Sequence, residues 1–485
     1  MRRRRPPRRD DADRRARAVS TPVAAARRRA VLAAFLALFA LSQALLWLAY
    51  YGAGAKRLIG DEQHYQDSAL AILAGGDWMT GTIWPPLQPL LLAGTYALFG
   101  TDVLAAQVLQ TLLLVACAAL LRDLWRQLGG SIAAANAAAA LFLLHPGIAA
   151  FAHWLWPELP HLFLMLAALC LLARAPSVAR GFAAGACIGL ALLAKSLLSP
   201  FWPLCLLMFV QRARPRIAFG AAAAFVLGVA LLTAPALLHG WREHGRPMIA
   251  DSSVYNLWVG LTDRWRSDYI EDMGGLTLPA FLASAPTPQQ RNAVYLERVR
   301  ARVLERGAPA LLADQLGRQY FRLFNAKTPL RSQLPGAACA GYLSAYRAPA
   351  WLVRSLTFGN DAAHALMLAA AGFGAAGWRW RRGGEPPDAR ERARRRLQWL
   401  VLLLLAYQLA LFALVHVKAR FLLPLAPMLC GLAASALVAL RARVGGPREA
   451  ALECTPLRVG AGAMLAALLL FLAFGGPLLD ASCAD

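Results

Sequence analysis

The feature that most constrains this chain is a series of long apolar segments separated by short, arginine-rich ones. Segments of about 18 or more apolar residues can cross the hydrocarbon core of a bilayer. The chain has 485 residues, of which 58% are hydrophobic and 16% charged, whereas a soluble domain carries charge on about a quarter of its residues. The sequence therefore predicts an all-α polytopic membrane protein.

Basic residues set the expected orientation. Residues 1–29 hold twelve arginines against three aspartates, and clusters of this kind remain on the cytoplasmic side of a membrane. This segment is expected to be a disordered cytoplasmic tail lying against anionic headgroups. Following the apolar segments from there gives about 11 transmembrane helices. The net charge of +24 is thus attributed to topology, and no nucleic-acid partner is expected.

The same threading predicts the organisation of the chain. A transmembrane catalytic core is expected at 30–238 and includes a first outer loop at 52–102. A large outer-face loop domain of mixed or helical structure follows at 239–359, and C-terminal transmembrane helices at 360–485. Within the first outer loop, Asp67 to Gly76 is expected to be a short amphipathic helix that ends at a glycine pair.

Four polar sites fall on one predicted face of the membrane, although they are far apart in sequence. They are Asp61-Glu62, His153 to His161, Lys195-Ser196 and His416 to Arg420. Charged residues bracketed by apolar sequence are costly in a membrane and are functional candidates by default. Their convergence on one side predicts a common site.

Asp61 is the candidate general base, because a carboxylate can accept the proton of an attacking hydroxyl group. Glu62 would point elsewhere on a helix, so one of the two is expected to be catalytic and the other structural. His64 and Tyr65 are candidates for binding sugar hydroxyls. The alternatives are that both carboxylates simply end a membrane helix in water and that Tyr65 is an interfacial aromatic residue.

Glu158 and His161 are one helical turn apart and would share a helix face. Together with Asp61 they are candidates for holding a divalent metal ion, although their spacing matches no recognised ligand motif. The alternative is a capping carboxylate beside an interfacial histidine. No cofactor is predicted with certainty.

Lys195, Lys418 and Arg420 suit a phosphate group. Arginine can hold phosphate through two parallel donors, whereas lysine acts as a point charge. The alternative for all three is that they extend to the headgroup level without a specific ligand.

Short motifs across nearly the whole chain resemble the integral-membrane GT-C glycosyltransferases. The branch that these motifs resemble most is the bacterial one related to protein O-mannosyltransferases and lipid A aminoarabinose transferases. The motifs are Gly60-Asp-Glu-Gln-His-Tyr65, Ala71-Ile-Leu-Ala-Gly-Gly76, Pro85-Pro-Leu-Gln-Pro-Leu90, Phe99-Gly100, Trp156-Pro-Glu158, Leu192-Leu-Ala-Lys-Ser196, Ser253-Val-Tyr-Asn-Leu-Trp-Val-Gly260 and Lys418-Ala-Arg-Phe-Leu-Leu-Pro424.

The resemblance implies a polyprenyl-phosphate-linked sugar donor, transfer with inversion, and a site on the outer, periplasmic face of the inner membrane. It makes Asp61 the catalytic carboxylate, Glu158 its partner from the second loop, and Arg420 the residue that handles the lipid phosphate. This sequence departs from the family pattern at Ile83-Trp84. The resemblance to members that act on lipid A would place a Glu-Lys pair at these two positions. That departure counts against a metal site and against an aminoarabinose donor.

The resulting hypothesis is a membrane glycosyltransferase of GT-C type, acting on a lipid, glycan or protein acceptor. A hexosyl and a pentosyl donor both remain open. The first rival is a polytopic lipid or glycan transporter, or flippase. Transporters usually contain repeated halves with broken helices near the middle of the membrane, and no repeat is evident in this sequence. The second rival is a non-catalytic assembly subunit, which would tolerate alanine at Asp61 and Arg420.

Overall fold

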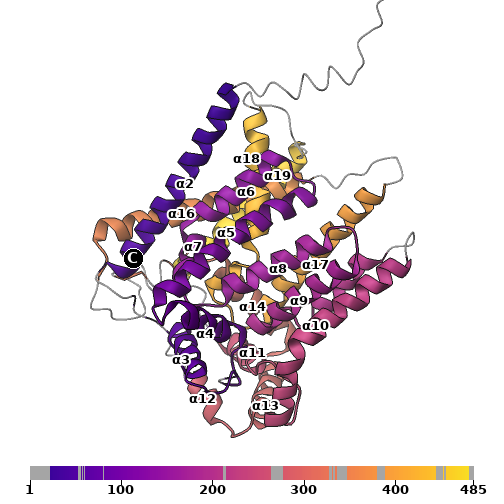
Figure 1. The fold of residues 1–485 in the computed structure, drawn as a ribbon. Helices are drawn as coiled ribbons and strands as arrows, with labels where there is room; N and C mark the ends of the chain where they lie inside the picture. The colour runs from indigo at the N-terminus through magenta and orange to yellow at the C-terminus, as the bar shows by residue number, and fades with distance from the viewer. Residues whose placement is uncertain are drawn as a thin grey trace, which may run out of the picture.

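The computed structural model describes residues 22–52, 56, 58, 60–79, 81–210, 215–263, 277–326, 330, 334–335, 347–378, 388–443, 452 and 455–479. Helices dominate this part of the chain, and no strand occurs in it beyond an isolated bridge between Trp378 and Leu452. Figure 1 shows the helices gathered in one bundle with a smaller group at one end. Most of residues 1–29, including the whole stretch 1–21, lies outside the described segments or has undescribed side chains.

The N-terminal half contains the helices of predicted membrane segments and of the predicted first outer loop. The α-helices are α2 (Pro22–Tyr51), α3 (Asp61–Leu73), α4 (Leu87–Phe99), α5 (Val103–Gln127), α6 (Ile132–Leu144), α7 (Pro146–Ala149), α8 (Glu158–Leu172), α9 (Val178–Ala194) and α10 (Pro215–His244). Three short 3₁₀ helices join them, namely η1 (Ala150–His153), η2 (Ser196–Leu198) and η3 (Trp202–Phe209).

The C-terminal half contains the helices of the predicted loop domain and of the last predicted membrane segments. They are α11 (Ser253–Thr262), α12 (Leu278–Ala283), α13 (Pro288–Arg306), α14 (Ala308–Phe324), α16 (Ala350–Gly377), α17 (Ala389–Leu414), η4 (Ala419–Leu422), α18 (Ala426–Arg443), α19 (Pro456–Phe474) and α20 (Gly476–Leu479). The described part of residues 239–359 is therefore helical.

Six of the described helices are long and apolar enough to cross a membrane. They are α2 from Arg29 onward, α5, α10, α17, α18 and α19. A seventh crossing results if α6 and the segment Pro146–His153, which meet at an angle of 66°, form one broken span. The prediction of an all-α polytopic membrane protein is confirmed.

The number of crossings is lower by this criterion than the sequence suggested. Two expected crossings are short apolar helices, α8 with 15 residues and α9 with 17, and α16 is not among the six. A fourth expected crossing, Phe201 to Val210, is the eight-residue 3₁₀ helix η3. At about 2.0 Å per residue, a 3₁₀ helix of that length covers only about half of a bilayer core.

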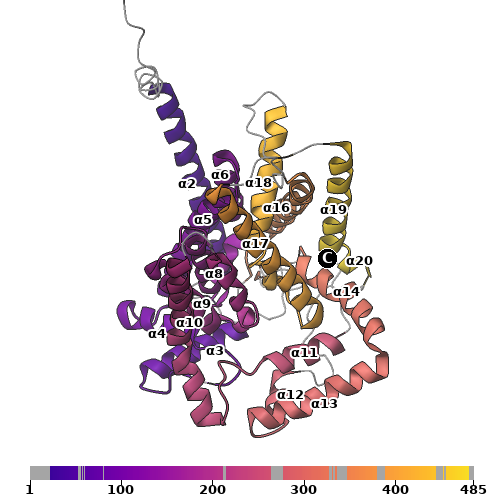
Figure 2. The same cartoon turned by 90° about the vertical axis from the view of Figure 1, so that its right-hand side faces the viewer.

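The first outer loop and the loop domain lie at the same end of the molecule. Figure 1 shows α3 and α4 near α11, α12 and α13 at its lower end, whereas the N-terminal end of α2 points away from them. Figure 2, turned by 90°, shows the same separation. The end of α10 also reaches this region, so three parts of the sequence are available to form a site there.

The short helix of the first outer loop begins earlier than expected. The sequence suggested a start at Asp67, but α3 begins at Asp61. Gly60 precedes it with a φ of 55°, a left-handed conformation that glycine adopts at little cost. Asp61 therefore lies at a helix N-terminus, where the helix dipole favours a negative charge.

Close packing between α9 and α10 depends on glycines. A Cβ atom added at Gly185 would lie 2.0 Å from the carbonyl oxygen of Phe225, and one at Gly181 would lie 2.1 Å from that of Ala221. Gly228 on α10 approaches α9 in the same way. Small residues allow helices in a membrane to approach closely enough for backbone contact. This contact fixes the end of α9, from which Lys195 projects.

Candidate active site

The site is built around Arg420, which joins two carboxylates from distant segments. Its Nη2 forms an ion pair with Oδ2 of Asp61, and its Nε lies 3.5 Å from Oε1 of Glu158. Arg420 belongs to η4, Asp61 begins α3, and Glu158 begins α8 directly after Pro157. Both carboxylates thus occupy first turns of helices, where negative charge is favoured. The tertiary fold places them around one guanidinium group.

Lys195 extends this arrangement on the side of Glu158. Its Nζ lies 2.8 Å from Oε1 of Glu158, the same oxygen that faces Arg420. Lys195 is the residue at which α9 ends. Glu158 is almost fully buried, with 2% of its side chain exposed. A buried carboxylate requires such partners, because an unpaired charge in this position would cost several kcal/mol.

Two aromatic rings, one each, pack against Arg420 and Lys195. The guanidinium carbon of Arg420 lies 4.6 Å from the centre of the Trp156 ring. Nζ of Lys195 lies 4.6 Å from the centre of the Phe421 ring. Both distances are within the range of a cation–π contact. The rings restrict where the cations can point and keep water from one side of them.

Lys418 adds a third positive charge close to the carboxylates. Burial lowers the pKa of Lys418 to about 8, and the neighbouring charge of Arg420 adds to this effect while Asp61 and Glu158 oppose it. Lys418 therefore changes charge near neutral pH. The charge cluster, defined here as Asp61, Glu158, Lys195, Lys418 and Arg420, carries two negative and up to three positive charges.

Asp61 is held in its ionised form. Burial alone would raise the pKa of Asp61, but the positive charges of Arg420, Lys418 and Lys195 outweigh that effect and keep its pKa well below the usual range. About a quarter of its side chain, 26%, remains exposed. Asp61 is therefore an anion that a ligand can reach, and its basicity depends on its cationic neighbours.

Glu62 has different partners from Asp61, although the two are adjacent. The Glu62 side chain is completely buried and forms an ion pair with Lys56. Its Oε1 also accepts a hydrogen bond of 3.0 Å from the backbone N–H of Leu155, and Lys56 donates to the carbonyl oxygen of His153 at 2.9 Å. This arrangement fastens the start of α3 to the segment before Glu158.

His64 and Tyr65 are close to the charge cluster but occupy different surroundings. The ring of His64 lies 3.9 Å from that of Trp84, measured between centroids, and His64 is partly exposed. Tyr65 is 3% exposed and contacts the edge of Trp84. Burial raises the pKa of Tyr65 well above its ordinary value, and the negative charges of Asp61 and Glu158 add to the rise. Of the two, His64 is the one accessible to a ligand.

His161 does not join the charge cluster through its ring. It is fully buried, and its Nδ1 lies 3.1 Å from the carbonyl oxygen of Ala191 on α9. Within the described parts of the chain, no group of three or more His, Cys, Asp or Glu side chains could hold a metal ion. The metal candidates Asp61, Glu158 and His161 are thus not brought together as a ligand set, and the two carboxylates face cations instead.

The structure brings together five of the residues singled out in the sequence, from four segments. Three contributors were not singled out individually: Lys56, Trp156 and Phe421. Trp156 could have been found, since it stands two residues before Glu158 in an apolar run and its indole can cover a cation. Lys56 offered no such signal, because its partner depends on where α3 begins.

Comparisons with known proteins give distant structural likenesses only. No protein-family model matches this chain, and no curated protein does. The chain is similar to the archaeal oligosaccharyltransferase AglB from Archaeoglobus fulgidus in complex with an inhibitory peptide and a dolichol-phosphate, at 15% identity and a TM-score of 0.42. This match covers 92% of this chain and 55% of the other, so the chain spans about half the length of that relative.

The chain is also similar to ArnT from Cupriavidus metallidurans. The apo state gives 18% identity and a TM-score of 0.37, with coverage of 86% of this chain and 80% of ArnT. The structure bound to undecaprenyl phosphate gives 17% identity and a TM-score of 0.35, with coverage of 84% and 79%. With TM-scores below 0.5, these likenesses assign no activity and no residue role here.

Proposed function

We propose that this protein is a membrane glycosyltransferase of GT-C type that moves a sugar from a polyprenyl-phosphate donor to an acceptor. The reaction would take place at the outer, periplasmic face of the inner membrane. One observation carries the proposal: Arg420 lies between Asp61 and Glu158, with Lys195 bound to the same Glu158 oxygen. A base and a set of anion-binding cations therefore adjoin each other at the surface of a membrane bundle.

The cations suit a phosphate attached to a lipid. With Lys418 protonated, the charge cluster has one more positive than negative charge, which a phosphodiester would neutralise. Arg420 can present two parallel N–H donors to phosphate oxygens, and Lys195 adds a compact charge beside it. The apolar helices that surround the site would hold the polyprenyl chain. The sugar–phosphate bond would then lie at the membrane surface.

Binding of the donor would also prepare the base. A phosphate that takes over the donors of Arg420 weakens the contact of this residue with Asp61. Because the cations hold the pKa of Asp61 down against burial, loss of that contact raises the pKa and makes Asp61 a better proton acceptor. Glu158 would remain bound to Lys195 and keep the cations in position.

The transfer step then follows with its atoms balanced. The acceptor oxygen attacks the anomeric carbon of the donor from the side opposite the phosphate, and Asp61 accepts the hydroxyl proton. The bond between the anomeric carbon and the phosphate oxygen breaks, and its electron pair leaves with the polyprenyl phosphate. Arg420, Lys195 and Lys418 stabilise the developing negative charge. The configuration at the anomeric carbon is inverted.

The test measures release of polyprenyl phosphate, which does not require a known acceptor. Membranes containing the wild-type protein or Asp61→Asn are supplied with undecaprenyl-phosphate-linked sugars, and the lipid product is quantified by mass spectrometry. Loss of a general base lowers a rate by about 10² or more, so we expect that decrease for Asp61→Asn. Binding of the donor should persist, because the cations remain.

Asp67→Asn is the matched control. Asp67 is exposed on the same helix, and its carboxylate accepts a hydrogen bond of 2.7 Å from Gln63. This variant should release product at the wild-type rate. Full transfer by Asp61→Asn would refute the proposal. Asp61-dependent movement of the sugar lipid across the membrane without cleavage would favour the transporter instead.

A further inference from the structure

A large open cleft lies near the start of α3, with His64 in its lining. Its volume is about 780 Å³, and it lies between the first outer loop, the end of α10, and helices α12 and α13. The lining residues are His64, Gly81, Thr82, Ile83, Trp84, Glu243, His244, Leu282, Pro286, Thr287, Pro288, Gln289 and Arg291. This volume is within the usual range for small-molecule sites.

His64 connects the cleft to the proposed base. It stands three residues after Asp61 on α3, and residues at this spacing share a helix face. The negative charge of Asp61 also acts on the imidazole of His64, which requires the two groups to be near each other. A ligand in the cleft that contacts His64 therefore lies close to the start of α3, where Asp61 is located.

Trp84 supplies a flat apolar surface inside the cleft. Its indole contacts the ring of His64 and the edge of Tyr65, so its orientation is fixed from two sides. It remains partly exposed and lines the cleft. An indole combines a large apolar face with a polar N–H group, which suits the C–H face of a pyranose ring.

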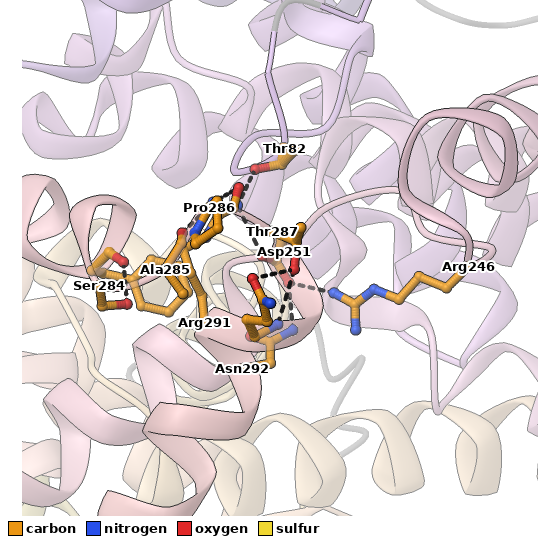
Figure 3. Close-up of polar contacts among 11 residues, drawn as sticks. Thr82, Arg246, Asp251, Ser284, Ala285, Pro286, Thr287, Arg291 and Asn292 are labelled. Carbon is orange, nitrogen blue, oxygen red and sulfur yellow. Dashed lines mark hydrogen bonds and ion pairs between the residues drawn. The ribbon is translucent and has the colours of Figure 1, made fainter.

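The arginine in the wall of the cleft is already engaged by the protein. Arg291 Nη2 donates to Oγ1 of Thr82 at 3.1 Å and lies 3.5 Å from Oδ2 of Asp251. Its Nη1 donates to the carbonyl oxygens of Ala285 and Pro286, both at 3.4 Å. Figure 3 shows these contacts converging on Arg291. Both terminal nitrogens have partners, so this guanidinium group is not arranged to bind a phosphate.

Asp251 holds this wall in place. It accepts a hydrogen bond of 2.6 Å from Asn292 and forms an ion pair with Arg246, as Figure 3 also shows. Its backbone N–H donates to the carbonyl oxygen of Thr82 at 2.6 Å. These contacts of Asp251 therefore connect Thr82 to Arg291 and Asn292 on α13. Among the described lining residues, Glu243 is the other charged group besides Arg291.

We infer that this cleft binds the acceptor of the proposed transfer reaction, and that the acceptor is an uncharged saccharide lying on Trp84. This inference rests on the proposed function and deepens it. Charge separates the two substrates: the anionic donor binds the charge cluster, whereas the acceptor enters a cleft whose exposed carboxylate would repel phosphate. Side chains such as His244, Thr287 and Gln289 are available to hydrogen-bond sugar hydroxyls.

Saturation-transfer difference NMR on the full-length protein in lipid nanodiscs tests the inference without a donor. The probes are N,N′-diacetylchitobiose and maltose as neutral saccharides, glucose 6-phosphate as a charged one, and the peptide Ala-Ser-Ala. At least one neutral saccharide should bind, and glucose 6-phosphate should bind more weakly. Loss of one aromatic contact weakens binding by about threefold to tenfold, which is the decrease expected for Trp84→Ala.

Two further variants control for misfolding and for binding outside the cleft. Leu282→Trp fills the cleft from a side chain that is 40% exposed, and it should abolish saccharide binding while the protein remains folded. Trp351→Ala removes an exposed indole, 58% exposed, that does not line the cleft, and it should bind like the wild type.

The result separates this inference from the proposed function. Equal binding by Leu282→Trp and the wild type, stronger binding of glucose 6-phosphate than of either neutral sugar, or Leu282-sensitive binding of the peptide alone would overturn the inference. In each of these cases Asp61-dependent release of polyprenyl phosphate would still stand. Saccharide binding without any Asp61-dependent release would instead refute the proposed reaction and leave a saccharide-binding membrane protein.

Discussion

Arg420 is the residue on which the proposed mechanism depends. In the resting protein its guanidinium group is shared between Asp61 and Glu158 and lies against Trp156. A lysine could not keep this planar set of contacts, because its ammonium group is a point charge. The same group that would bind the donor phosphate also holds the base ionised. In the proposed mechanism, donor binding and activation of the base are therefore coupled through one side chain.

We expect Lys418 to make the proposed donor binding dependent on pH. Its pKa is lowered to about 8 by burial and by Arg420, so it is positively charged below pH 8 and loses its charge as the pH rises above it. A phosphodiester does not titrate in this range. A hydrogen bond to a charged group contributes about 1.5 kcal/mol or more, so we expect the donor affinity to fall by about tenfold between pH 7 and pH 9.5. Binding to labelled donor in nanodiscs measures this.

Lys418→Arg provides the comparison. Arginine remains protonated over the whole range, so the variant should show a nearly flat affinity profile. If the variant and the wild type lose affinity in parallel, Lys418 is not the titrating contact.

The sequence identified the members of the charge cluster but not their partners. Asp61, Glu158, Lys195, Lys418 and Arg420 stood out because each interrupts or borders an apolar run, where charge is costly. Asp61 and Glu62 could not be told apart, because they are adjacent and chemically alike. Their surroundings differ in the structure, because α3 begins at Asp61 and Glu62 pairs with Lys56. That outcome depends on tertiary contacts.

At the scale of elements, the buried pair of Lys56 and Glu62 positions α3. Their side chains are 2% and 0% exposed. We expect Lys56→Met to lower the free energy of unfolding by about 3 kcal/mol or more, because it leaves a buried carboxylate without a counter-charge. The temperature of unfolding, followed by circular dichroism in detergent, measures the loss.

A double variant separates the missing charge partner from lost packing. Lys56→Met combined with Glu62→Gln removes both charges and keeps an oxygen that can accept the N–H of Leu155. It should recover a large part of the lost stability. A double variant as unstable as Lys56→Met alone would show that packing of the lysine chain matters more than charge.

The contact between α9 and α10 offers a second prediction at this scale. Gly185→Val should strongly destabilise the protein, because its side chain would meet the backbone of Phe225. Gly94→Val on α4 is the matched control, since a Cβ there meets nothing within 4 Å. Thermal unfolding of both variants gives the comparison. Similar losses in the two would mean that the destabilisation does not come from the contact between α9 and α10, because helix propensity favours valine slightly over glycine in both helices.

At the scale of the whole molecule, topology decides whether the site is on the outer face. We propose that α13 is outside and the start of α17 inside, as the distribution of basic residues suggests. Ala293→Cys on α13 and Ala389→Cys on α17 are both at exposed positions. In intact spheroplasts, a membrane-impermeant maleimide should label the first, and it should label the second only after permeabilisation.

Labelling of the parent protein with its native cysteines gives the background for this experiment. The cysteines that the structure describes are buried or partly buried. Labelling of Ala389→Cys in intact spheroplasts would place the start of α17 outside and reverse the proposed orientation. The charge cluster would then have to be assigned to the cytoplasmic face.

The fold was predictable from the sequence where the hydropathy of a segment is enough to define a helix. Long apolar runs gave α2, α5, α10 and α17, because composition and length suffice for a membrane helix. Hydropathy does not register a break in the backbone, so the 66° bend before Pro146 and the 3₁₀ helix η3 were missed. Proline at the start of α7 removes a backbone donor at the point where the chain turns.

The ion pair between Asp61 and Arg420 has a consequence for how far the protein could be engineered. The pair stabilises the protein before the donor binds, yet every turnover of the proposed reaction would have to break it so that the donor phosphate can reach Arg420. A substitution that tightened the pair should raise resistance to heat and slow the reaction together. Thermal stability and catalytic rate would then depend in opposite ways on a single contact, so selection for either one would change the other.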